Sequence, residues 1–596
     1  MTRQPRPSFL VPRPSSLVPR PSPFDSLALT VMSHAVAMIA EEMGSVLIRG
    51  AISPNIRERR DASSALFDAR GRMVAQAAHI PVHLGAMPEA VRAVRACAPA
   101  PGDVFLLNDP YHGGSHLPDL TLIEAIDAGG AIAGFAAVRA HHADVGGMSP
   151  GSMPQGATEL LQEGLVVPPV RLATAAGFDR HVLALVLANV RTPHERLGDL
   201  EAQRAACAAG AAGWRELHAR EGPRLDAAVD ALLDYSERLA RARIEAMGLI
   251  AGRADDALEG DGVTEDPVAV AVTVSARGGS LRLDFTGTSP MVAGNVNCPL
   301  AVTRAAAVFV LRTLLAGDVP TNDGIARAIE LVVPDDCAID ARWPAAVAAG
   351  NVEMSQRIAD TIFLALADAG VAVPAQGQGT MNNVTFGGRG WTFYETVGGG
   401  QGAGAAGPGP DAVHVGMSNT RNTPVESLET AYPIRIDEYA VRRGSGGAGA
   451  HRGGHGVVRR YRVLEPCTVT LLTERRRMAP AGAAGGLSAG SFHSARAALA
   501  RTRRHTVPRR TVPRHTRGRR CQPVTFTTAA RLRKRLTRCA DGDAGNPYRL
   551  RGPCGLNRKR GFSLTSRTPF APPQGIEDRL SFRKRIHAGS VRDAGA

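Results

Sequence analysis

Hydrophobic and polar positions alternate along this chain with two different periods. Apolar residues recur every three or four positions from Ser26 to Ile48, which predicts a long helix. A second helical stretch begins with Thr192 as N-cap and Pro193 in the first turn, and it runs to about Met247 with a break near Gly222. The pattern between these helices predicts a hairpin over 64–76, a helix near 86–97, and strands at 104–107 and 132–140.

The second half of the chain opens with period-two alternation. Valines occupy every other position from Val268 to Val274, a turn follows, and Leu281, Leu283 and Phe285 continue the pattern, as in a hairpin with one buried face. Mixed helix and strand patterns continue to about 486, with glycine-rich turns at 398–410 and 444–456. We therefore predict a mixed α/β (α+β) fold, a multi-layer body with two subdomains, 24–255 and 256–486.

Composition separates both ends of the chain from this body. Residues 1–23 contain seven prolines and a repeated LVPRPS, which is typical of an extended, disordered leader or of a misplaced start codon. Residues 487–596 hold 26 Lys+Arg and 5 Asp+Glu, whereas residues 1–486 hold 44 and 50. We expect 487–596 to be a basic, disordered tail, because its charges repel one another and it has little apolar surface to bury.

The remaining composition bounds the cellular setting. No run of eighteen apolar residues predicts a membrane span, and the start of the chain lacks the apolar core of a secretion signal. The eight cysteines show no CxxC pair and no regular spacing, so we interpret them as reduced thiols of a cytoplasmic protein.

Candidate chemistry follows two of the predicted strands. The strand 104–107 leads into NDPYHGGSHLPD (108–119), and the strand 132–140 leads into HHADVGG (141–147). If both loops lie at one end of a sheet, His116, Asp119, His141, His142 and Asp144 come together. Imidazole and carboxylate ligands without thiolate suit Mn²⁺, Fe²⁺ or Zn²⁺. The alternative is that these histidines and aspartates only shape and cap the loops.

A second polar group precedes these loops. Arg57, Arg59 and Arg60 lie in SPNIRERRDAS (53–63), and His83 follows in HIPVHLGAMP (79–88). Arginine binds carboxylates and phosphates bidentately, so Arg57 and Arg60, with His83, are our candidate substrate-binding residues. A solvated surface charge run is the alternative. Glu159 and Glu163 in GATELLQEG (156–164) are weaker candidates, because the pair also fits one face of a short helix.

A nucleotide site within the chain is not predicted. The glycine-rich run at 397–409 lacks the GxxxxGK[ST] pattern, and all three lysines of the chain lie in the tail. If ATP takes part in the reaction, we expect it to be bound by a partner protein.

With these residues in view, the chain resembles the hydantoinase B/oxoprolinase family, which includes B subunits of ATP-dependent N-methylhydantoinases, the C-terminal half of 5-oxoprolinases and the acetone carboxylase alpha subunit. The resemblance covers roughly residues 25 to 486, in the family's order. The matching stretches are SPNIRERRD (53–61), VAQAAHIPVHLGAMP (74–88), NDPYHGGSHLPD (108–119), HHADVGGMSPGSMP (141–154), NVRTPHERLGDLEAQ (189–203), GNVNCP (294–299), GNVEMSQRIAD (350–360), QGTMNNVTFG (378–387) and SNTRNTPVESLE (418–429).

The resemblance implies a metal-bearing B-type subunit that opens a five-membered cyclic amide, after an A-type ATPase subunit has phosphorylated the substrate. Manganese serves in the carboxylase branch. Carried over by motif, His116, Asp119 and His141 are the expected metal ligands. Asp109, His142 and Asp144 are the expected catalytic or supporting residues.

The tail departs from the family, whose members continue after about 486 to a glycine-rich terminus. The change from TERRRMAPAGAAGG (473–486) to an arginine-rich text suggests a shifted reading frame. Two alternatives therefore stay open beside the hydrolase. One is a subunit like the acetone carboxylase alpha chain, and the other is an inactive product whose tail binds nucleic acid without sequence preference.

Overall fold

The computed structural model describes residues 24–490, except 79, 84, 249, 316 and 318, together with 492–493 and 524–528. All of these belong to one compact unit, Met1–Leu532. The predicted leader 1–23 and most of the predicted tail lie outside the described residues.

A seven-stranded antiparallel sheet forms the N-terminal half, in the order β2-β1-β5-β4-β3-β6-β7. Its strands are β1 (Ala62–Asp68), β2 (Met73–Ala78), β3 (Val104–Leu107), β4 (Asp119–Asp127), β5 (Ile132–His141), β6 (Val170–Thr174) and β7 (Gly177–Phe178). Because β4 pairs antiparallel with both β3 and β5, these two strands run in the same direction. The loops that follow them therefore lie at one edge of the sheet, as the sequence predicted.

The strand β4 between them was not predicted, and the two predicted strands are not neighbours. Most of β4 is buried on both faces, so its sequence shows no alternation of polar and apolar residues. Leu120 and Leu122 face the core under α1 and α5, whereas Ile123 faces the core under α3.

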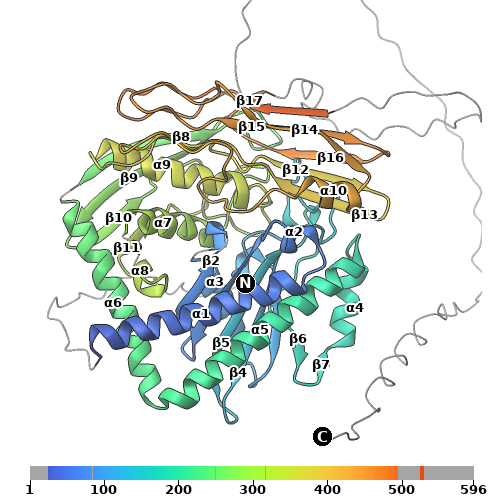
Figure 1. The fold of residues 1–596 in the computed structure, drawn as a ribbon, viewed down its shortest axis with the longest axis vertical. Coiled ribbons are helices and arrows are strands. Elements are labelled where there is room, and N and C mark those ends of the chain that lie inside the picture. Colours follow the sequence, from blue (N-terminus) through green and yellow to red (C-terminus); the bar gives the residue numbers. More distant parts are fainter. Residues whose placement is uncertain are drawn as a thin grey trace, which may run out of the picture. The chain divides into compact units, whose positions relative to one another are not determined.

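Helices cover both faces of this sheet. Figure 1 shows α1 (Ser26–Gly50) and α5 (Pro193–Glu221) side by side across one face. The helix α3 (Met87–Ala96) packs on the opposite face. Among the described residues α1 alone is long and apolar enough to cross a membrane, but a core helix has the same composition, and Val36, Ala40 and Met43 are buried against the sheet and α5. These three helices and α6 (Arg224–Ala246) confirm the predicted helical stretches.

The second half contains the predicted hairpin. The strands β9 (Val268–Arg277) and β10 (Ser280–Asp284) pair antiparallel within the four-stranded sheet β11-β10-β9-β8. Val268, Val270, Val272 and Val274 are buried, so the alternation identified the core face correctly. The other strands are β8 (Ala251–Leu258) and β11 (Ile329–Val332), and the helices α7 (Leu300–Leu314) and α9 (Ser355–Asp368) pack in the same core. The division into subdomains at 255/256 stays a prediction.

Two smaller sheets complete the described structure, in the orders β13-β12-β16 and β14-β15-β18-β17. Their strands are β12 (Asn383–Gly388), β13 (Trp391–Thr396), β14 (Ile434–Arg442), β15 (Gly456–Val463), β16 (Thr468–Leu472), β17 (Phe492–His493) and β18 (Val524–Thr528). The remaining α-helices are α2 (Pro54–Arg57), α4 (Arg180–Ala188), α8 (Asp323–Ala326) and α10 (Val425–Ala431). The pairing of β18 with β15 places two short strands of the predicted tail in a sheet, and the fold as a whole is mixed α and β in several layers, as predicted.

Candidate metal centre

The loop after β3 turns sharply because two glycines let backbone segments approach closely. Gly113 has φ 97°, in the left-handed region, and a side chain on it would meet the backbone of Ala90 at 2.4 Å. A side chain on Gly114 would meet the carbonyl oxygen of Asn108 at 2.2 Å. The loop can therefore fold back on its own start, and it returns the chain to the sheet at Asp119.

Strand register then brings the first two candidate ligands together. Asp119 is the first residue of β4, His141 is the last residue of β5, and the two are directly opposed across the ladder. His116 joins them because the Asp119 backbone N–H donates to the His116 carbonyl, which closes a short turn.

The three side chains form a compact, fully buried cluster. His116 Nε2 lies 3.0 Å and His141 Nδ1 lies 3.1 Å from Asp119 Oδ1, and the two ring nitrogens are 3.2 Å apart. Within the described residues this is the one group of three or more His, Cys, Asp or Glu side chains with metal-ligand spacing.

The second oxygen of Asp119 is also enclosed. Ser115 Oγ donates to Asp119 Oδ2 over 2.5 Å and Asn351 Nδ2 over 3.3 Å, while His83 Nε2 lies 3.4 Å away. His83 is held in turn by Ser63 Oγ at 3.0 Å from its Nδ1. Such outer partners fix the orientation of a ligand side chain.

Burial and charge act in opposite directions on the pKa values of these groups. Burial opposes ionisation of Asp119, but the charge on His116 and hydrogen bonds from His116, His141 and His83 hold its pKa well below the usual range. Burial would likewise lower the pKa of His116, but Asp119 and the hydrogen bond to Ala348 raise it. Burial lowers the pKa of His141. These shifts favour an ionised Asp119 carboxylate beside a protonated His116 ring.

These residues fit a divalent transition metal. The His116 Nδ1 atom lies 3.3 Å from the Ala348 carbonyl oxygen, an acceptor, so Nδ1 carries hydrogen and Nε2 presents its lone pair in the neutral ring. Once His116 is neutral, three lone-pair atoms lie 3.0–3.2 Å apart, where one bound cation can take the place of the shared proton. Two imidazoles and a carboxylate are a donor set that transition metals prefer.

A small cavity adjoins the cluster, with a volume of about 10 Å³, which suits one ion or one water molecule. His141 Nε2 and Asn351 Oδ1, two buried atoms of its wall residues, have no hydrogen-bond partner among the described residues. The full lining is Asp61, Ile80, Val82, His83, His116, Asp119, His141, Asn351, Val352, Met381, Tyr394, Thr396, Ser418 and Thr420.

The three predicted catalytic or supporting residues hold other positions. Asp109 accepts from the Tyr111 backbone N–H over 2.9 Å and pairs with His112, so it shapes the loop. Asp144 accepts from backbone N–H groups of Gly146, Gly151 and Arg191 and thus holds the next loop. His142 Nε2 lies 2.9 Å from Gln203 Oε1, and burial lowers its pKa. None of the three lines the small cavity.

Of the predicted substrate-binding residues, His83 lies in the cluster, whereas Arg57 is half exposed and paired with Glu58. Arg60 has φ 57°, a left-handed conformation that ends the turn after α2. Neither Arg57 nor Arg60 lines the small cavity. The neighbouring Arg59 is fully buried instead, and its guanidinium carbon lies 4.9 Å from the centre of the ring of Tyr394, a residue of the cavity wall.

Sequence reasoning missed wall residues from the distant second half of the chain. The Tyr394 ring stacks on His141 with centroids 4.3 Å apart, and Arg59 Nη2 donates to Thr420 Oγ1 over 3.4 Å. Asn351 lies in a π-helical turn, Gly350–Met354, a distortion that is common at functional sites. Asn351 and Thr420 occur in motifs that carried the family resemblance, but Tyr394 follows no such signal.

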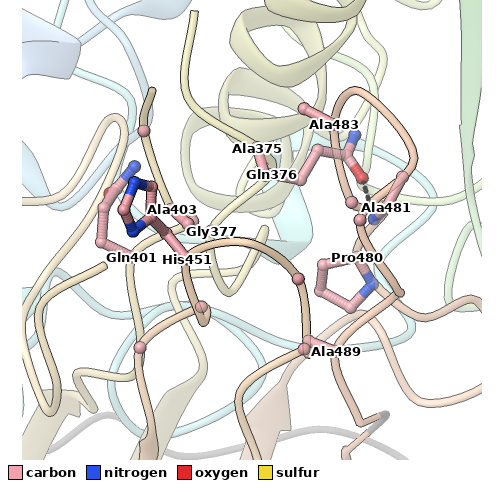
Figure 2. Close-up of a pocket in the computed structure, with 18 of the residues that line it drawn as sticks. Ala375, Gln376, Gly377, Gln401, Ala403, His451, Pro480, Ala481, Ala483 and Ala489 are labelled. Carbon is pink, nitrogen blue, oxygen red and sulfur yellow. Dashed lines mark hydrogen bonds between the residues drawn. The ribbon is translucent and has the colours of Figure 1, made fainter. Parts of the chain in front are cut away.

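A much larger cavity, of about 620 Å³, lies among the glycine-rich segments of the second half. Figure 2 shows alanines, Gln376, Gln401 and His451 around it, with the Ala481 backbone N–H donating to Gln376 Oε1. None of its lining residues is Asp, Glu, Lys or Arg. Of these two cavities, the small one is therefore the one with charged side chains in its wall.

The family model for hydantoinase B/oxoprolinase matches residues 25–530. The chain belongs to the hydantoinase B/oxoprolinase family. The match reaches beyond residue 486, where the resemblance by motif ends, and it includes β18.

Several members of this family are similar to the chain in sequence. An uncharacterized protein of Methanocaldococcus jannaschii is 39% identical, over 78% of this chain and 83% of its own. A protein of Pseudomonas sp., named as a candidate B-type component of a D-/L-hydantoinase, is 31% identical, over 77% of this chain and 81% of its own. The 5-oxoprolinase 1 of Arabidopsis thaliana is 36% identical over 78% of this chain, which spans only 37% of that longer protein.

Solved structures share the fold. The ATP-dependent caprolactamase of Pseudomonas jessenii superimposes with a TM-score of 0.73 at 25% identity, over 79% of this chain and 85% of its own. A nucleotide-free acetone carboxylase gives a TM-score of 0.71 at 20% identity, over 80% of this chain and 68% of its own, a likeness of fold alone.

Proposed function

We propose that this chain is the B-type subunit of an ATP-dependent hydantoinase or 5-oxoprolinase, and that it opens a five-membered cyclic amide. One observation carries the proposal: a buried His116–Asp119–His141 cluster beside a cavity, in a member of the hydantoinase B/oxoprolinase family.

The metal would be held by His116 Nε2, Asp119 Oδ1 and His141 Nδ1, and when bound it supplies a Lewis acid that polarises the amide carbonyl or activates water. Two imidazoles and a carboxylate without thiolate suit Mn²⁺, Fe²⁺ or Zn²⁺. We therefore propose one of these three ions.

The chain's own residues would orient the amide. Asn351 donates through Nδ2 to Asp119. Among the described residues, the Oδ1 atom of Asn351 is therefore free to accept from the substrate N–H. His141 Nε2 is the other polar atom without a partner among the described residues of the wall. With Nδ1 on the metal, its Nε2–H would donate a hydrogen bond to an oxygen of the substrate. The cavity of about 10 Å³ is smaller than a five-membered ring, so the proposal requires the wall to open when substrate binds.

An A-type ATPase subunit is the proposed partner. The similarity to a relative named as the B-type component of a hydantoinase, over most of both chains, supports a separate partner. The lack of lysine in 1–486 supports ATP binding on that partner. We propose a cytoplasmic assembly, in keeping with the free thiols Cys97, Cys207, Cys298, Cys337 and Cys467.

The test is co-expression of the full chain with the A-type ATPase, followed by an assay of ring opening with hydantoin, 5-oxoproline or acetone. We expect ATP-dependent release of the ring-opened acid from a cyclic amide, and no release by either protein alone. Bicarbonate-dependent consumption of acetone would overturn the proposal in favour of a carboxylase. ATP-independent hydrolysis by the isolated chain would overturn the proposed division of labour.

A further inference from the structure

Glu163 is a fully buried carboxylate that the proposed reaction does not use. It follows a short 3-10 helix, Leu160–Gln162, in the stretch GATELLQEG. Burial raises the pKa of Glu163 to about 8, in spite of hydrogen bonds from Ala348 and Val347. A carboxyl group at such a position costs free energy unless its oxygens are well bonded.

Both oxygens of Glu163 accept from the irregular segment 345–349. The Val347 backbone N–H donates to Oε1 over 3.0 Å and to Oε2 over 3.2 Å, and the Ala348 backbone N–H donates to Oε1 over 2.9 Å. This segment belongs to no helix or strand whose regular hydrogen bonds would satisfy these two N–H groups. Glu163 therefore fixes the position of the Ala348 peptide units.

The same segment carries the acceptor that orients a metal ligand. The Ala348 carbonyl oxygen lies 3.3 Å from His116 Nδ1, so this carbonyl determines which nitrogen of His116 carries the hydrogen. With hydrogen on Nδ1, Nε2 presents its lone pair 3.0 Å from Asp119 Oδ1.

A second contact holds the segment from the other side. Tyr111 Oη, in the same loop as His116, donates to the Ala345 carbonyl oxygen over 2.7 Å. The segment 345–349 is thus tied both to the loop that supplies His116 and to the turn that supplies Glu163. A shift of this segment would move the Ala348 carbonyl relative to the imidazole ring.

We propose that Glu163 is a positioning residue of the metal centre, which holds the Ala348 carbonyl so that His116 offers Nε2 to the metal. The inference rests on the proposed function, because it presumes the metal site. It assigns Glu163 no contact with the substrate. Outer residues that orient metal ligands typically change metal affinity by about 10- to 100-fold when they are replaced.

The test measures the dissociation constant for Mn²⁺ of the full metal-free chain, by competition with a chelator, alongside its thermal unfolding. Glu163→Ala should weaken Mn²⁺ binding by about 10- to 100-fold. Glu163→Gln should stay close to the wild type, because its amide oxygen can take the place of Oε1, which accepts from both N–H groups. The matched control is Glu159→Ala, an exposed glutamate four residues earlier.

Each outcome decides the matter. Mn²⁺ affinity within about twofold of wild type in a folded Glu163→Ala variant would overturn the proposal and leave Glu163 a purely structural residue. If Glu163→Ala does not fold, Glu163→Asp carries the test, since a carboxylate one methylene shorter cannot reach both N–H groups, and unchanged affinity there would equally overturn it. A wild type that binds no Mn²⁺ would overturn it as well. A wild type that binds Mn²⁺ but, with its partner, opens no cyclic amide would refute the proposed function alone.

Discussion

Two cavities of the described structure differ in size and in chemistry: the larger one has no charged side chain in its wall, and the smaller one has several. The cavity of about 620 Å³ is enclosed largely by glycine and alanine and has no Asp, Glu, Lys or Arg in its wall. The cavity of about 10 Å³ has Asp61, Asp119 and three histidines in its wall. Electrostatic interactions are stronger where water is excluded, so the small cavity is the better place for catalysis. Volume alone would point to the other cavity.

One segment of the second half of the chain, residues 378–381, contributes to the lining of both cavities. Gln378 lines the large cavity, Met381 lines the small one, and Thr380 between them donates through its hydroxyl to Glu353 Oε1 over 2.9 Å. Because Asp61, Asp119 and three histidines line only the small cavity of the two, changes in the two cavities should differ strongly in their effect on metal binding.

The largest effect is expected from Asp119→Asn. This change keeps the size of the side chain but removes the negative charge beside His116 and His141, and it places an amide next to their two ring nitrogens. Metal binding should be lost, and ring opening by the assembly should fall by more than about 100-fold, beyond the loss typical of outer residues. The control is Asp127→Asn at the far end of β4, where the carboxylate only accepts from the Gly130 backbone N–H. Equal activity of the two variants would show that the small cavity is not the reaction site.

A smaller effect is expected from Glu353→Gln, at the buried residue that accepts the hydrogen bond from Thr380. Burial and then the nearby Glu474 raise the pKa of Glu353 from 4.5 to about 8. The unfolded chain loses this proton first, so the contribution of Glu353 to stability is greatest below about pH 4.5 and falls as pH rises to about 8, by at most about 1.4 kcal/mol per pH unit. Glu353→Gln should reduce this slope, as measured by urea unfolding at several pH values. Parallel curves for the two proteins would contradict the raised pKa.

The smallest effect is expected in the large cavity. Ala403→Leu adds three carbons to a space of about 620 Å³, so metal affinity and ring opening should change by less than about twofold. The matched variant is Ser418→Leu in the small cavity, which has no room for the added carbons and should lose metal. A large loss of activity with Ala403→Leu would give the large cavity a part in the reaction.

The sequence predicted the centre of this site better than its wall. Loops after β3 and β5 were expected at one edge, and the pairing of Asp119 with His141 follows from that arrangement. The strand β4 was missed because burial on both faces removes the alternation on which strand prediction relies. In SPNIRERRD the sequence could not distinguish the buried Arg59 from Arg57 and Arg60, since the inward direction depends on the left-handed turn at Arg60.

The wall residues Asn351 and Tyr394 could not be predicted for a different reason. They lie more than 200 residues from His141, and only the packing of the second half against the sheet brings them to it. No local pattern encodes such contacts. The predicted subdomain boundary, the roles of Asp109, His142 and Asp144, and the disorder of the tail stay predictions.

The central claim is tested most directly by the metal content of the purified full chain. Elemental analysis after loading and desalting should find about one Mn²⁺, Fe²⁺ or Zn²⁺ per chain in the wild type. His116→Ala combined with His141→Ala should contain none, whereas His181→Ala combined with His194→Ala, two exposed histidines, should retain it. Full metal content in the His116 and His141 variant would contradict the account.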